Sequence, residues 1–178
     1  MGCAEYLNQK DWEAIHLYLS TKIDTFNRYG AMLQGDLGEE IAYDIAVNHL
    51  GMTPTGFAPA KHGLDGVFVD DKGRTVVIDS KATTGNLFQL LHPTVNNGDQ
   101  LTNDWVYANA GLMQRQESAQ CIGNNKAIGE RVQQAIENQS IRCILVHTNP
   151  ETQVVRAYER ISEDNVRSAS SWQEIQWK

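Results

Sequence analysis

Two neighbouring stretches of the chain carry acidic side chains and a lysine. Asp65 lies in the first stretch, and the second ends with Asp79, Ser80 and Lys81. Two carboxylates that lie close together repel each other unless a positive charge lies between them. A divalent cation can supply that charge, since Mg²⁺ prefers oxygen ligands and commonly takes one or two protein carboxylates. These residue types therefore predict a site for Mg²⁺ or Mn²⁺, with Zn²⁺ less favoured.

The same two stretches have the pattern of a β-hairpin. Residues 63–69 and 75–81 each predict a short strand, and residues 70–73, Asp-Asp-Lys-Gly, form a polar connection that contains a glycine. Side chains alternate across a strand, so Asp79 and Lys81 are expected on one face, whereas the alternate valine and isoleucine residues face a core. A carboxylate within such an apolar strand is costly unless it is paired or binds a metal, which favours a functional role for Asp79.

These residues resemble the motif of the PD-(D/E)xK nuclease superfamily, which has the restriction-endonuclease-like fold. In that family one strand carries an acidic residue, and the next strand carries an acidic residue, one spacer and a lysine. Asp65 matches the first acid and Asp79 the second. Ser80 matches the spacer and Lys81 the lysine, whereas Leu64 stands in place of the proline that names the motif.

A further acidic residue of the family often follows a glycine in an upstream helix. Gly38, Glu39 and Glu40 fit this pattern, with Glu39 the better match and Glu40 the spare. Without the resemblance, Glu39 would be a solvated glutamate that the helix dipole favours in a first turn.

The resemblance implies a Mg²⁺-dependent endodeoxyribonuclease. Asp65, Asp79 and the carbonyl of Ser80 would hold the metal. Glu39 would join them directly or through a water molecule, and Lys81 would orient the attacking water or stabilise the developing negative charge. Hydrolysis of the phosphodiester bond would leave a 5′-phosphate and a 3′-hydroxyl. DNA is favoured over RNA because most members of the superfamily cut DNA.

A second short segment, residues 100–106, resembles an element that follows the lysine in nuclease toxin domains of bacterial polymorphic toxin systems, which include contact-dependent inhibition. The resemblance implies that Gln100 and Thr102 contact the phosphate or a metal-bound water, with Gln89 as a spare. Trp105 is also well explained as a core tryptophan. Such a toxin domain would be delivered into a competing cell as part of a larger effector and held in check by a cognate immunity protein.

The acidic balance of the chain sets a limit on nucleic-acid binding. The formal net charge is −7 over 178 residues, which counts against a broad electrostatic grip on DNA. Contact with DNA would then depend on a local basic cluster. The candidates are Lys61, Lys126, Arg131 and Arg142.

Cysteine usage and hydropathy give the expected compartment. The three cysteines are scattered and do not indicate a disulfide framework. Cys143 and His147 lie four residues apart on one predicted strand, but no further ligands with zinc spacing accompany them, so Cys143 is expected in the core. No apolar run approaches the length of a membrane span, and no signal peptide is visible. A cytoplasmic protein without a membrane partner is expected, in the producing cell or in a target cell after delivery.

The order of the predicted elements gives the expected fold class, α/β. It matches the αβββαβ core of the restriction-endonuclease-like fold, a mixed sheet flanked by helices, with an extra N-terminal helix. We expect a single nuclease domain over residues 1–178, with a helical extension at 1–30, a catalytic core at 35–160 and a weakly helical tail at 161–178. Outside the hairpin, the predicted elements are helices 11–29, 37–50 and 129–138 and strands 53–60, 141–148 and 154–158.

Several other functions share parts of this pattern. An RNase toxin on the same fold could cut tRNA, and a restriction enzyme or a phage recombination nuclease would use the same chemistry. A catalytically inactive nucleic-acid-binding module is the remaining alternative. The intact set of Asp65, Asp79 and Lys81 counts against it, because a dead copy need not keep them.

Overall fold

The structure is a computed structural model, and it describes residues 35–60, 63–94, 98–149, 151–152 and 154–177. The predicted helix 11–29, the extension at 1–30 and the candidate DNA contact Lys61 lie outside the described residues. No helix in the described part has both the length and the apolar character needed to cross a membrane.

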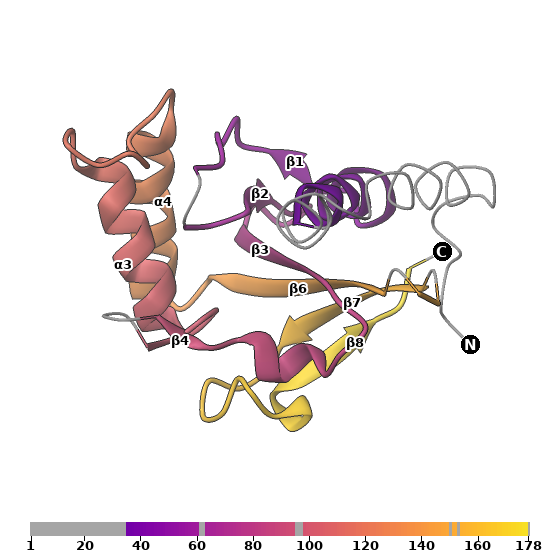
Figure 1. Cartoon of the computed structure of the whole chain (residues 1–178). Helices are drawn as coiled ribbons and strands as arrows, with labels where there is room; N and C mark the ends of the chain where they lie inside the picture. Colours follow the sequence, from indigo (N-terminus) through magenta and orange to yellow (C-terminus); the bar gives the residue numbers. More distant parts are fainter. Residues whose placement is uncertain (1–34, 61–62, 95–97, 150, 153, 178) are drawn as a thin grey trace, which may run out of the picture.

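A mixed six-stranded sheet forms the centre of the molecule (Figure 1). Its strand order is β1-β2-β3-β6-β7-β8, and β3 and β6 pair in parallel while the other neighbours are antiparallel. A separate two-stranded ribbon pairs β4 with β5. The strands are β1 (Thr53–Pro54), β2 (Gly66–Val69), β3 (Thr75–Ala82), β4 (Pro93–Thr94), β5 (Gly98–Asp99), β6 (Arg142–Asn149), β7 (Val154–Arg160) and β8 (Trp172–Ile175). The expected α/β class with a mixed sheet flanked by helices is therefore confirmed.

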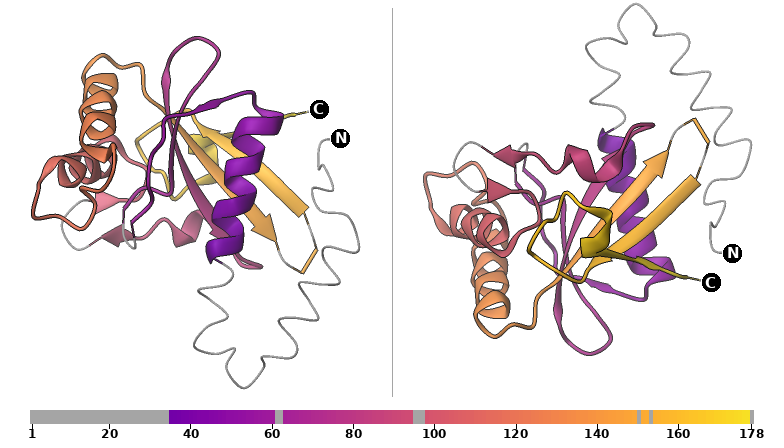
Figure 2. Two further views of the ribbon diagram at one scale, coloured as in Figure 1. Left: turned by 90° about the horizontal axis from the view of Figure 1, so that it is seen from above. Right: turned by 90° about the horizontal axis from the view of Figure 1, so that it is seen from below.

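Helices cover the sheet on both sides. The helix over residues 35–44 continues into the π-helical turn η1 (Ile45–His49) and lies on one face only: it is in front of the strands from above and behind them from below (Figure 2). The helices α3 (Asn103–Gln114) and α4 (Asn125–Glu137) pack side by side at the end where β6 begins (Figure 1).

The alternation of β3 divides the core into two clusters. Val76 and Ile78 pack with Ile45 beneath the helix over residues 35–49. Val77 faces the opposite side and packs with the cluster that contains Trp105 of α3. Because both faces of β3 and β6 are covered, these strands have nearly continuous apolar sequences.

The hairpin is formed as the sequence predicts. β2 and β3 pair from Val69 opposite Thr75 to Gly66 opposite Ile78. Gly73 has a positive φ of 77° in the connecting turn, a conformation that favours glycine. The pairing with β2 stops at Ile78, so the last residues of β3 have β6 on one side and no strand on the other. This one-sided end of β3 carries two of the predicted catalytic residues, Asp79 and Lys81.

Three predictions of secondary structure are wrong. The strand expected at 53–60 is limited to β1, and the tail at 161–178 forms the 3₁₀ turn η3 (Ala169–Ser171) and strand β8 where weak helix was expected. Sequence analysis missed α3, whose two asparagines and one glycine give it poor intrinsic helix propensity. The polar stretch at 82–99 contains the 3₁₀ turn η2 (Leu87–Leu90), where Leu87 is buried.

Candidate active site

The central contact of the site joins Lys81 to Asp79. The Nζ atom of Lys81 lies 2.5 Å from Oδ2 of Asp79, and the side chains are 19% and 4% exposed. They share a face of β3, as the alternation predicts. Apart from this ion pair, Asp79 Oδ2 has no hydrogen-bond donor within the described part of the chain. Asp79 is therefore a buried carboxylate whose charge is balanced by one neighbouring amine.

Asp65 takes the place of the missing strand beside β3. Its Oδ2 accepts a hydrogen bond from the backbone N–H of Ser80 at 2.8 Å and a second, from Ser80 Oγ, at 3.2 Å. The Asp65–Gly66 pair is not a turn here, because Asp65 directly precedes β2 and reaches across to β3. The backbone N–H and C=O of one strand residue point to the same side, so the carbonyl of Ser80 also leaves β3 at this edge.

Glu39 reaches the site from the helix over residues 35–44. A Cβ atom at Gly38 would lie 3.4 Å from Ala82 Cβ and 3.4 Å from Ser80 Oγ, so the helix lies close to the end of β3. This packing places Glu39 of the same helix near the end of the hairpin.

Burial and like charge act together on Asp65. Burial and the negative charge of Asp79 raise the pKa of Asp65 to about 7. The hydrogen bond from Ser80 and the positive charge of Lys81 oppose this shift, and Glu39 adds to it. The carboxyl of Asp65 is therefore poised to ionise near neutral pH.

The same charges act on Glu39 and Lys81. Burial raises the pKa of Glu39, with further contributions from Asp36 and Asp79 and an opposing one from Lys81. Burial alone would lower the pKa of Lys81, but the charges of Asp79, Asp65 and Glu39 outweigh it and raise that pKa. Lys81 thus stays protonated. Glu39, Asp65, Asp79 and Lys81 form one electrostatically coupled set, called here the acid–lysine cluster.

The donor types of the cluster fit a hard cation such as Mg²⁺. Carboxylate and carbonyl oxygens are its preferred ligands. Asp79 Oδ2 is buried without a hydrogen-bond donor, and burial together with the negative charge of Asp79 raises the pKa of Asp65. In the described part of the chain, however, no three Asp, Glu, His or Cys side chains converge into a group that could hold a metal. Lys81 occupies the position beside Asp79 where a cation would balance the charge.

An open cleft of about 810 Å³ leads to the cluster. Asp65 and Glu39 line it, together with Glu40, the spare acid of the sequence motif. Its walls come from the helix over residues 35–44 and from the segment around β1 and β2. The acidic character of this cleft repels phosphate groups unless cations are bound. The other lining residues are Asp36, Ala42, Tyr43, Asp44, Pro54, Thr55, Gly56, Phe57, Pro59, Gly66, Val67, Phe68 and Ile78.

Gln100 and Thr102 are not joined to the cluster by any hydrogen bond or ion pair in the described structure. Thr102 is the N-cap of α3: its Oγ1 accepts from the N–H of Trp105 at 3.3 Å and donates to the carbonyl of Asp99 at 2.8 Å. Trp105 is a buried core residue. Gln100 Oε1 is buried without a hydrogen-bond partner. The structure gives the Thr102 hydroxyl a capping role, and the expected phosphate contacts of Gln100 and Thr102 stay predictions.

The remaining spare residue, Gln89, lies on η2 and has a partner of its own. Its Oε1 accepts a hydrogen bond from Arg167 at 3.1 Å. This contact does not involve the acid–lysine cluster. The side chain thus links η2 to the segment between β7 and β8.

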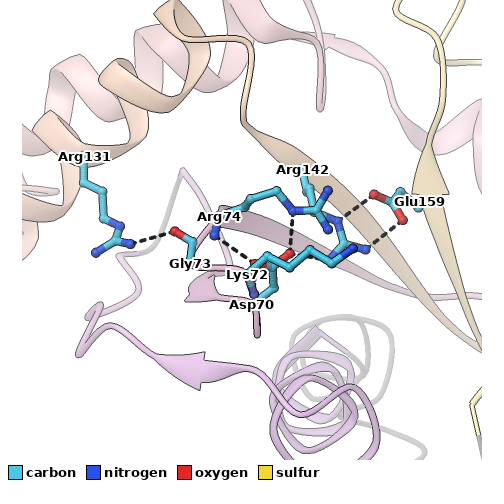
Figure 3. Close-up of polar contacts among 7 residues, drawn as sticks. All are labelled: Asp70, Lys72, Gly73, Arg74, Arg131, Arg142 and Glu159. Carbon is cyan, nitrogen blue, oxygen red and sulfur yellow. Dashed lines mark hydrogen bonds and ion pairs between the residues drawn. The ribbon is translucent and has the colours of Figure 1, made fainter.

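The basic residues expected to bind DNA differ in their contacts and in their exposure. Arg142 donates to both carboxylate oxygens of Glu159 at 2.7 Å and to Asp70 at 3.0 Å, so its charge is neutralised within the sheet (Figure 3). Arg131 bonds Thr75 Oγ1 at 3.1 Å, next to the hairpin turn. Lys126 is exposed on α4. Arg142 is thus engaged by two carboxylates, and a contact of these residues with DNA stays a prediction.

Sequence analysis did not connect His147 or Arg156 with the site. In the parallel pairing of β3 with β6, His147 is the register partner of Lys81, and Arg156 of β7 is the register partner of His147. Cys143, four residues before His147, is buried in the core as expected. No signal in a single sequence gives the register between strands that lie far apart in the chain.

Comparisons with known proteins did not identify a family for this chain. Scans against protein-family models, curated proteins and solved structures gave no significant match. The geometry and chemistry of the acid–lysine cluster are therefore the indication of function in the described residues.

Proposed function

We propose that this chain is a metal-dependent endonuclease of the PD-(D/E)xK type that hydrolyses phosphodiester bonds, with DNA as the favoured substrate. The carrying observation is that Asp79 and Lys81 form an ion pair at the end of β3, where Asp65 bonds Ser80, and that Glu39 of the covering helix lies near enough for its charge to act on them. These four residues are also the ones that match the sequence motif.

The arrangement of the elements supports the same proposal. A helix precedes β1, β2 and β3, and two helices then lead to β6, which pairs in parallel with β3. This order is the one expected for the αβββαβ restriction-endonuclease-like core, with an additional helix and the additional strands β4, β5, β7 and β8. An acid before β2 and an Asp-Ser-Lys triplet at the end of β3 are the positions that the motif requires.

The chemistry follows from the charges of the cluster. Asp65, Asp79 and the Ser80 carbonyl would hold a Mg²⁺ or Mn²⁺ ion, with Glu39 joining directly or through water. When bound, the ion would lower the pKa of a water molecule and neutralise charge on the phosphate. Lys81, kept protonated by Asp79, would donate a hydrogen bond to the attacking water or to the phosphate oxygen that gains charge. Asp65 would lose its proton when the cation binds, because metal ligation requires the ionised form.

A cleavage assay tests this proposal directly. Plasmid DNA and total RNA are incubated side by side with the protein in Mg²⁺ and in excess EDTA. The expected result is nicking or linearisation of the plasmid in Mg²⁺ only, and none with Asp79→Ala. Cleavage that persists in EDTA would refute the metal mechanism, and cleavage of RNA alone would favour the RNase toxin on the same fold.

The biological context is a second, separate part of the proposal. The resemblance of residues 100–106 to a toxin element supports a toxin domain controlled by a cognate immunity protein. Expression of the chain alone in a bacterial cytoplasm should then stop growth, and Asp79→Ala should restore it. Harmless high-level expression of an active nuclease would exclude the toxin role and leave the nuclease proposal intact.

A further inference from the structure

The sheet places three basic side chains in one line beyond the acidic part of the site. Lys81, His147 and Arg156 are register partners on β3, β6 and β7, and register partners project from the same face of a sheet. We call this line the cross-strand basic row. Neighbouring strands lie about 4.8 Å apart, so Lys81 and Arg156 start about 10 Å from each other.

The middle member of the row is held in a fixed orientation. A backbone carbonyl can only accept a hydrogen bond, so Nε2 of His147 donates its proton to the carbonyl of Thr83 at 2.9 Å. Burial lowers the pKa of His147, the bond to Thr83 opposes this shift, and the positive charge of Arg156 lowers the pKa further. A neutral imidazole therefore separates the two permanent cations, and the charge of Arg156 is close enough to act on it.

Arg156 differs in its setting from other arginines of the sheet. Arg142 is 17% exposed and makes contacts of 2.7 to 3.0 Å with two carboxylates. Arg160 is buried and bonds the Leu101 carbonyl and Asn103. Arg156 is 43% exposed and lies 3.9 Å from Glu174. The exposed part of its side chain is therefore within reach of a ligand, in addition to its contact with Glu174.

The charge distribution of the site favours the cross-strand basic row over the acidic cleft as a path for phosphate groups. A nucleic-acid strand cannot lie along the acidic cleft beside Glu39 without many bound cations, because its phosphates would be repelled. The row begins at Lys81, within the acid–lysine cluster, and leads away from that cleft across the same end of the sheet. Arginine is well suited to phosphate because its planar guanidinium can donate two parallel hydrogen bonds.

We propose that Arg156 binds a phosphate of the nucleic-acid backbone next to the one at Lys81, so that the substrate strand crosses β3, β6 and β7 along the cross-strand basic row. This inference rests on the proposed nuclease function and assigns a substrate-binding residue to it. Because about 10 Å separates the two cations at their strands, they contact different phosphates of one strand. His147 forms the neutral surface between them.

Equilibrium binding tests the assignment apart from cleavage. A fluorescently labelled DNA duplex and a matched single strand are titrated with the full chain, with Ca²⁺ in place of Mg²⁺ and in a parallel series with EDTA, over a range of salt concentrations. Arg156→Gln should weaken binding about two- to fivefold, the effect of one exposed ion pair. It should also reduce the slope of log K against log salt by about 0.7 to 0.9, the value for one lost phosphate contact.

Matched variants separate a phosphate contact from a structural effect. Arg156→Lys keeps the charge and should keep the salt slope. Arg115→Gln removes an exposed arginine at the end of α3 by the same substitution and should change neither affinity nor slope. Thermal unfolding of each variant identifies loss of fold, and the Lys variant retains its diagnostic value if Arg156→Gln is unstable.

The outcomes distinguish this inference from the proposed function. Binding that depends on Arg156 without any cleavage would remove the nuclease function and retain the nucleic-acid contact. Cleavage with an unchanged affinity and salt slope in folded Arg156→Gln would overturn the inference and retain the nuclease. Absence of measurable DNA or RNA binding by the unmodified chain would also overturn it, and binding of Arg156 to a protein partner would then be the alternative.

Discussion

Lys81 Nζ lies 2.5 Å from Asp79 Oδ2, and this pair is the point where the charge balance of the candidate site is decided. The amine is the positive group in contact with Asp79, while Asp65 and Glu39 add negative charge nearby. Removing one partner of a buried ion pair is strongly destabilising, because the remaining buried charge is left without compensation. The pair therefore links the chemistry of the site to its stability.

Replacement of Lys81 should affect rate and stability in different ways. Lys81→Ala should reduce kcat strongly with little loss of metal affinity, because a cation is not a metal ligand. Without divalent cations it should also destabilise the fold by about 3 kcal/mol, since Asp79 is left buried and unpaired. Mg²⁺ should restore much of that stability. Lys81→Arg should not rescue the rate, because a planar guanidinium cannot replace a compact amine. Steady-state kinetics and denaturant unfolding with and without Mg²⁺ check this, and near-normal turnover of Lys81→Ala would remove Lys81 from the catalytic set.

Asp65 should make stability fall with rising pH when no divalent cation is present. The pKa of Asp65 is about 7 in the folded state, against about 3.9 for an unfolded aspartate. Between these values the folded state binds the extra proton, so the free energy of unfolding decreases as pH rises through this window, by up to about 4 kcal/mol. Urea unfolding in EDTA from pH 4.5 to 7.5 measures the decrease.

Two variants provide the controls for this pH effect. Asp65→Asn should reduce the decrease, whereas Asp71→Asn, at an exposed carboxylate of the hairpin turn, should keep it. Added Mg²⁺ should also reduce it, because the cation compensates the ionised carboxylate. An identical pH dependence in Asp65→Asn and the unmodified chain would show that Asp65 is not the titrating group.

The ion-pair network at the other end of β3 should support the fold without affecting the chemistry. Asp70 accepts a hydrogen bond from Arg74 at 2.8 Å and another from Arg142 at 3.0 Å (Figure 3). Arg142 also donates to Glu159. Asp70→Asn should lower the free energy of unfolding by about 3 kcal/mol, the typical cost of removing one partner of a buried pair. Asp71→Asn, one residue further on, should be close to neutral. Values of kcat measured below the melting temperature should be unchanged in both variants, and a selective loss of kcat in Asp70→Asn would contradict a purely structural role.

The same network should make the protein sensitive to acid. Burial would raise the pKa of Asp70, but the hydrogen bonds from Arg74 and Arg142 outweigh it and lower that pKa. A lowered pKa in the folded state gives stability that is present above the unfolded value of about 3.9 and is lost as the pH falls below it. The effect of Asp70→Asn on stability should therefore be largest at neutral pH and disappear toward pH 2, as measured by thermal unfolding.

Substitutions of Thr102 should show whether its hydroxyl acts as a helix cap or contacts phosphate. Thr102→Ala should cost about 1 kcal/mol of stability through loss of the α3 N-cap, and Thr102→Ser should retain it. Neither change should alter the salt dependence of DNA binding if the hydroxyl acts only as a cap. A weaker affinity in Thr102→Ala, together with a normal melting temperature, would instead place Thr102 at the substrate.

Local sequence patterns were sufficient to predict the hairpin and the positions of its charged residues. The strand alternation put Asp79 and Lys81 on one face, and the polar turn with Gly73 fixed the register of β2 against β3. Both depend on interactions between residues that are close in the chain, so a single sequence contains them. The covering helix and the buried strand β6 were found for the same reason, from periodicity alone.

The tertiary structure decided what lies beside those residues. Pairing β6 in parallel with β3 sets His147 next to Lys81, and packing of the helix over residues 35–44 against the end of β3 brings Glu39 to the site. Packing stabilises α3 despite its weak helix propensity and makes the tail an edge strand. Arg142 is committed to Asp70 and Glu159 by the same long-range contacts. Charge and alternation are local properties, whereas register, packing and ion-pair partners depend on which distant segments meet, so the sequence determined the reactive groups and the fold determined their neighbours.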